Sequence, residues 1–217
     1  VLDIGSSSIG GAFFEVNKKG PPKIIFSTRE PIIFEKKFEV GKFLPATLKA
    51  LDLVLARMSK KGGGKILRIS CVLSSPWYAS QTRKIKYEKN TPFVFTDKLA
   101  DRLIQKEVSL FEEQNISGLA DSRSEVKLIE FKNMKTLLNG YAISSPIGKK
   151  AQNLEMTVFF SMSSIDVLEQ IENTIFRHFH TKSVLFSSFA LSSFVVARDM
   201  FIDKEDFLLV DIAGEMT

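Results

Sequence analysis

The chain opens with VLDIGSSSIGGAFFEV (residues 1–16), in which an aspartate, a glycine and three serines lie between two apolar runs. The apolar runs predict two short strands, and the small polar residues between them predict a tight turn. The unit therefore presents a carboxylate and three hydroxyls where one strand gives way to the next. Taken alone the signal is weak, because Asp-x-Gly at the end of a strand is often only a hairpin turn.

A second segment, VDIAGEMT (210–217), repeats the order of an apolar run, an aspartate and a turn of small residues with a hydroxyl. The chemistry of a nucleoside triphosphate explains both segments. Backbone N–H groups approach polyphosphate most closely where residues are small, and serine and threonine hydroxyls add donors. Magnesium keeps several of its waters, so carboxylates hold it through water. Asp3 and Asp211, facing one cleft, suit that role.

Bulk composition limits the function classes. The chain has 217 residues and a net charge of +5, with lysine and arginine scattered along it. The densest basic run, RKIKYEK (83–89), alternates like the exposed face of a strand, so we expect no nucleic-acid partner. The single cysteine, Cys71, lies in an apolar run, which indicates a buried thiol and excludes an internal disulfide. No apolar run reaches the roughly 20 residues of a membrane-spanning helix.

Strand and helix patterns alternate in two parts of the chain and change character between them. The first 75 residues contain three predicted strands, a helix over 43–61 and a buried strand. Residues 83–162 contain a strand, an amphipathic helix over 96–114 and two more strands, a small α+β unit. From residue 163 a helix, a strand and a short helix follow, and then, over 206–217, a strand that runs into a glycine turn. This order predicts an α/β fold interrupted by an inserted module.

The paired segments resemble the two phosphate motifs of the actin-like ATPase superfamily, which has a ribonuclease H-like fold. DIGSSSI (3–9) is similar to the first motif and DIAGEMT (211–217) to the second. In that superfamily two hairpins from related domains clamp the β- and γ-phosphates. The resemblance implies ATP and Mg²⁺ as cofactors, the metal being held by Asp3 and Asp211 through water. It assigns cofactor binding to Asp3, Gly5, Ser6, Ser7, Ser8, Asp211, Gly214 and Thr217.

The inserted module resembles the SHS2 module of the FtsA and PilM families. NGYAISSPIGKKAQNLEMTVFFSMSSIDVLEQIENTIF (139–176) is similar to FtsA in its order of turn, Pro-x-Gly loop, strand and helix, and DIGSSSI is at least as similar to PilM. The resemblance implies an ATPase subdomain whose first part is 1–82, an SHS2-like module over 83–162, and the rest of the subdomain over 163–217. It corresponds to about the N-terminal half of such a protein.

The second motif departs from the family pattern Asp-x-Gly-Gly-Gly-Thr-Thr. Ala213 and Glu215 stand where the pattern has its first and third glycines, and Met216 removes a hydroxyl. Alanine narrows the approach to phosphate, and a glutamate near polyphosphate is electrostatically unfavourable. We therefore expect nucleotide binding with at most weak ATPase activity.

The resemblance implies an ATP-binding bacterial actin-like scaffold protein of the FtsA type, which links a cytoskeletal or pilus assembly to the membrane. The resemblance implies self-association into filaments or dimers, and a partner that is a tubulin-like division protein or a pilus-assembly peptide. It also implies a cytoplasmic location at the inner face of the membrane, reached through parts outside this chain. Two alternatives stay open: a degenerate, nucleotide-free interaction protein of the same fold, and a small-molecule kinase of the same superfamily.

Overall fold

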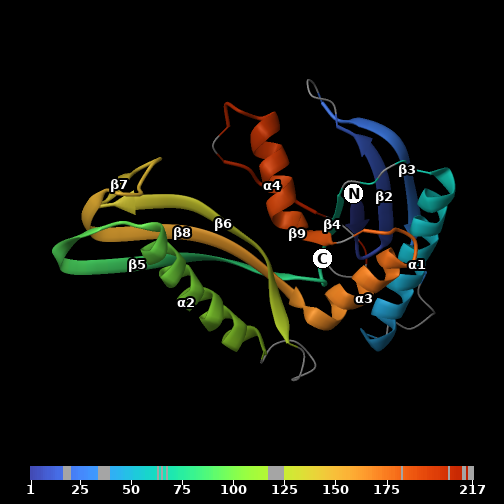
Figure 1. The fold of residues 1–217 in the computed structure, drawn as a ribbon, viewed down its shortest axis with the longest axis horizontal. Coiled ribbons are helices and arrows are strands. Elements are labelled where there is room, and N and C mark those ends of the chain that lie inside the picture. Colours follow the sequence, from blue (N-terminus) through green and yellow to red (C-terminus); the bar gives the residue numbers. More distant parts are fainter. Residues whose placement is uncertain are drawn as a thin grey trace. The chain divides into compact units, whose positions relative to one another are not determined.

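The computed structural model describes residues 1–16, 21–33, 40–62, 64, 66, 68–116, 125–181, 183–204, 206–211 and 214. The chain forms two compact units (Figure 1). The first unit joins Val1–Ala79 to Ile165–Thr217, and the second unit, Ser80–Ser164, is inserted between these two segments. The junctions expected from the sequence were 82/83 and 162/163.

The first unit is built on a five-stranded mixed sheet with the strand order β3-β2-β1-β4-β9. β2 pairs antiparallel with both β1 and β3, whereas β4 runs parallel to β1 and β9 parallel to β4. The opening segment therefore forms the predicted strand, turn and strand, and β1 lies at the centre of the sheet. The strands are β1 (Leu2–Ile4), β2 (Ser8–Glu15), β3 (Lys23–Pro31), β4 (Ile69–Leu73) and β9 (Val184–Ser188).

Helix α1 (Val40–Lys61) runs along β2 and β3 and packs against α3 (Ile165–Phe176) (Figure 1). Its apolar residues recur at helical spacing and are buried toward the sheet, Val54 and Met58 among them. The close approach of helix and sheet depends on Gly11 of β2, because a Cβ there would lie 2.7 Å from the side chain of Val54. α1 ends at Lys61 and is followed by Gly62, whose φ of +73° is the left-handed conformation that favours glycine after a helix.

After β9 the chain continues into α4 (Phe189–Met200), where the sequence predicted a short helix over 190–200. The hydroxyl of Ser188 caps this helix by accepting a hydrogen bond from the N–H of Leu191 at 3.2 Å. The strand expected over 206–217 was wrong for its described part, because residues 206–211 form no strand. The apolar run predicted burial, but Leu208 is 91% exposed. Such a run becomes a strand only where a neighbouring strand completes its backbone hydrogen bonds.

The second unit is a four-stranded sheet in the order β5-β8-β6-β7 with one helix packed beside it (Figure 1). Phe111 of the helix packs edge-on against Phe160 of β8, with ring centroids 4.9 Å apart. The predicted order of strand, helix and strands is confirmed, and the predicted Asn139-Gly140 turn leads into a short extra strand. The likeness of this unit to an SHS2 module stays a prediction. Its elements are β5 (Ala79–Val94), α2 (Asp97–Ile116), β6 (Val126–Leu138), β7 (Tyr141–Ala142) and β8 (Lys150–Ser164).

The described part of the chain is thus a mixed α/β protein with two sheets and four helices. Of the helices described above, none combines the length and apolar character needed to cross a membrane. The central position of β1 places its turn into β2 at the middle of the first sheet, and the candidate site begins at that turn.

Candidate functional site

Three strands each contribute one residue to a row across the first sheet. Asp3 of β1 lies opposite Gly10 of β2, and Gly10 lies opposite Arg29 of β3. Residues paired in this way point to the same face of a sheet, so the carboxylate and the guanidinium share one face. This face is opposite to α1, because Gly11, the next residue of β2, points toward the helix.

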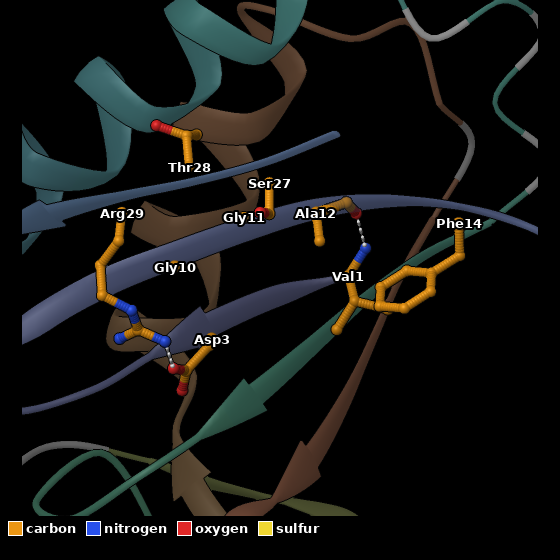
Figure 2. A pocket seen from close by; sticks show the side chains of 9 residues that line it. All are labelled: Val1, Asp3, Gly10, Gly11, Ala12, Phe14, Ser27, Thr28 and Arg29. Carbon is orange, nitrogen blue, oxygen red and sulfur yellow. Dashed lines mark hydrogen bonds and ion pairs between the residues drawn. The ribbon is translucent and has the colours of Figure 1, made fainter. Parts of the chain in front are cut away.

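The guanidinium of Arg29 crosses β2 and joins two residues of the opening segment. Its Nη2 atom donates to Oδ2 of Asp3 at 2.7 Å (Figure 2), and its Nη1 atom donates to the hydroxyl of Ser8 at 2.8 Å. The path is open only because residue 10 is glycine, since a Cβ there would lie 2.8 Å from Nη2. The Arg29 side chain is 58% exposed and these bonds use two of its five N–H donors, so others stay accessible from solvent.

An open hollow of about 440 Å³ lies over this ion pair (Figure 2). Strands β1 to β3 form its floor. Asp3 and Arg29 make one end polar, Phe14 makes the other end apolar, and Ser27 lies between them. The hollow therefore offers an anion a guanidinium and a hydroxyl on one side and an apolar surface on the other.

The second motif meets the first through its glycine. Gly214 donates its backbone N–H to the hydroxyl of Ser6 at 3.1 Å, although 208 positions separate the two residues. Ser6 is 1% exposed, and a Cβ on Gly214 would lie 2.8 Å from the Cβ of Ser7. Gly214 is therefore in close contact with the first turn, and at this residue the second segment lies against the first.

The other residues predicted to bind cofactor differ in their surroundings. Gly5 is half-buried, and a Cβ there would lie 2.7 Å from the carbonyl oxygen of Ser8, so the turn requires glycine. Ser7 is exposed, and its carbonyl accepts from the N–H of Ile32 at 2.8 Å. Asp211 is exposed, and Thr217 lies outside the described residues. The role of all these residues in nucleotide binding stays a prediction.

The surroundings of Asp3 do not fit a magnesium ion held there through water. The carboxylate already binds the guanidinium of Arg29, and a dication beside it would meet a charge of the same sign. At about 4 Å such a pair repels by roughly 2 kcal/mol in water and by about 8 kcal/mol at the effective dielectric of a protein surface. Within the described ranges, no three acidic, histidine or cysteine side chains gather as metal ligands. A polyphosphate fits better, because the first turn is built of small residues and Arg29 is an exposed cation.

Sequence reasoning missed Arg29 and Gly10. Arg29 stands next to Glu30 on a strand, where charged residues are ordinarily expected to face solvent. The signal that was present is the pair Gly10-Gly11, because glycine inside a strand marks a place where another group approaches closely. Here one glycine admits a guanidinium and the other admits a helix, on opposite faces of the sheet.

Comparisons with known proteins add a weak structural likeness. No family model and no curated protein matches the chain. Among solved structures, a chain of the "PilM-PilN type IV pilus biogenesis complex" is similar, with a TM-score of 0.39 and 13% sequence identity. The match covers 80% of this chain and 43% of that chain, so the present chain spans less than half the length of its neighbour. A likeness at this level carries no argument about fold or function.

Proposed function

We propose that this chain is part of an ATP-binding, actin-like scaffold protein of the PilM or FtsA type, with the polyphosphate bound where the two motifs meet. The observation that supports this proposal most directly is the contact of Gly214 with Ser6 and Ser7. It brings the glycine of the second motif against two serines of the first turn, and a clamp on phosphate oxygens needs such a close approach of small residues. Hydrolysis is proposed to be weak at most, because Ala213 and Glu215 stand in place of glycines.

The inserted second unit is proposed to carry the partner-specific part of the function. Ser80–Ser164 forms a compact unit of its own, and β5 and β7 lie at the two edges of its sheet, where an incoming strand can pair. The proposed partners are a second copy of the protein and a pilus-assembly peptide or tubulin-like division protein. The proposed location is the inner face of the cell membrane.

Titration of the complete protein with a fluorescent ATP analogue tests nucleotide binding. Unlabelled ATP should displace the analogue, whereas adenosine should not, because the proposed contacts are made to phosphate. Gly214→Ala should weaken binding, since its Cβ would collide with Ser7 and separate the two turns. A complete, folded protein that shows no ATP-competed binding would contradict the proposal.

A nucleotide-free interaction protein of the same fold is the second candidate. The N–H of Gly214 already donates a hydrogen bond to the hydroxyl of Ser6, and Arg29 already donates hydrogen bonds to Asp3 and Ser8. Several polar groups expected to meet a nucleotide are therefore paired within the chain. This candidate predicts that partner binding is unchanged by ATP, so the two candidates are separated by measuring partner affinity with and without the nucleotide.

A further inference from the structure

Two neighbouring residues of β3 form ion pairs on opposite faces of the first sheet. Glu30 points toward α1 and accepts from Nη2 of Arg57 at 2.6 Å, which ties the helix to the sheet. Arg29 points to the other face and binds Asp3 beneath the hollow. The first pair joins two packed elements, whereas the second lies over strands that backbone hydrogen bonds already hold together. The fold therefore does not depend on the Asp3–Arg29 pair to join separate elements, and the pair can take part in binding a ligand.

The geometry of Arg29 suits a phosphate group. A guanidinium is planar and permanently charged, and it binds phosphate oxygens through parallel N–H donors. Asp3 and Ser8 hold this guanidinium from one side, while the rest of the side chain opens on the hollow. A side chain fixed in this way loses little conformational freedom when an anion arrives.

The charges around Asp3 favour the same assignment. A bare carboxylate at this turn would repel a polyphosphate, so it needs a cation between them. Arg29 already lies against that carboxylate at 2.7 Å and still has donors to spare. Gly10 makes this possible, because any side chain at residue 10 would block the path of the guanidinium.

We infer that Arg29 is the cation of the phosphate site and stands where a divalent metal was expected, so that nucleotide polyphosphate binds without magnesium. In this arrangement Arg29 contacts the phosphate oxygens, and Asp3 is a positioning residue that orients the guanidinium. The inference rests on the proposed nucleotide binding and deepens it by naming the group that carries the positive charge.

The test is a pair of titrations of the complete protein with a fluorescent ATP analogue, one with magnesium chloride and one with EDTA. The affinity of the unaltered protein should differ by less than about threefold between the two buffers. Arg29→Met keeps the apolar stem and removes the charge, and it should lower the affinity by about tenfold or more in both, because charge-assisted hydrogen bonds to phosphate are strong. Arg29→Lys should lose less, since it keeps the charge.

Two further variants test whether a metal held by Asp3, or a general effect on the fold, accounts for the result with Arg29→Met. Asp3→Asn keeps the shape of the side chain but removes the charge that orients the guanidinium, so it should weaken binding to the same extent with magnesium and with EDTA, whereas with a metal held by Asp3 the loss would appear only with magnesium. Arg57→Met removes the ion pair to Glu30 on the opposite face and should leave the affinity unchanged. Thermal unfolding of every variant shows that the comparison is made between folded proteins.

The outcomes distinguish this inference from the proposed function. Binding that requires magnesium, is lost in Asp3→Asn and survives Arg29→Met would overturn the inference and leave nucleotide binding in place. No binding in either buffer by the folded, unaltered protein would overturn the proposed function, and the inference with it.

Discussion

His178, two residues beyond the end of α3, lies 2.9 Å from the carboxylate of Asp52 on α1, and the two residues are 126 positions apart in the chain. In the sequence, the inserted second unit lies between α1 and α3. The contact therefore joins the two segments of chain that make up the first unit. Arg177 reaches the same carboxylate at 3.4 Å. α3 also packs against α1, and Ile171 of α3 is fully buried.

The buried interface is expected to contribute more stability than the ion pairs. Asp52 is 43% exposed, so Asp52→Ala should lower the free energy of unfolding by about 1 kcal/mol or less. Ile171→Ala removes buried apolar volume and should cost about 2–5 kcal/mol. Urea unfolding of the two variants measures both values. Equal losses would contradict the expected order of the two contributions.

The hydrogen bond between Gly214 and Ser6 should be measurable as stability. Ser6→Ala leaves the N–H of Gly214 without its acceptor, so the free energy of unfolding should fall by about 1 kcal/mol. Ser7→Ala is the matched control, because its side chain is exposed and its change should stay within about 0.5 kcal/mol. The measurement is urea unfolding, and identical values for the two variants would show that the contact contributes nothing.

Gly11→Val should destabilise the first unit by overpacking. The new side chain would collide with Val54 and Met58 of α1, and such collisions typically cost about 1–3 kcal/mol. Ala12→Val adds a side chain of the same size on the opposite face, over the open hollow, and should change stability far less. Thermal unfolding of both variants tests the comparison, which fails if Ala12→Val is the more damaging.

Cys71 should make the stability depend on pH in the alkaline range. Burial raises the pKa of its thiol far above the usual value of about 9, so the thiol stays neutral in the folded protein and ionises in the unfolded chain. This stabilisation is fully present below about pH 9, and above it the free energy of unfolding should fall by up to about 1.4 kcal/mol per pH unit. Urea unfolding between pH 7.5 and 10 measures the slope, and Cys71→Ala should lack this component.

Removal of the second unit should separate the two proposed activities. A variant in which Ala79 is joined directly to Ile165 should lose self-association or partner binding and keep nucleotide binding, because the two motifs lie in the first unit. Nucleotide binding also reports that the shortened protein is folded. Sedimentation and partner capture measure the first property. A variant that still assembles and still captures its partner would place recognition in the first unit.

Local sequence patterns were sufficient to predict those strands and helices whose apolar spacing and capping residues lie within the element itself. The opening strands and α2 follow from local alternation, from helical spacing and from Thr96, which accepts a hydrogen bond from the N–H of Leu99 at 3.2 Å. The same reasoning failed at 206–211, because an apolar run states a preference for burial and not whether a partner strand is present. It missed Arg29 because the residue gains its place only when β1, β2 and β3 align, and register between strands is absent from local patterns.

The guanidinium of Arg29 occupies the space that a side chain at residue 10 would fill, so substitutions at these two positions depend on each other. A side chain at residue 10 and a guanidinium crossing from residue 29 exclude each other, since the Cβ of the first would lie 2.8 Å from the second. Among related chains, these two positions should covary: a larger residue at 10 should accompany the loss of arginine at 29. A single substitution at either site would pass through an intermediate that has either a collision or an uncompensated Asp3, so the two changes are expected to be inherited together.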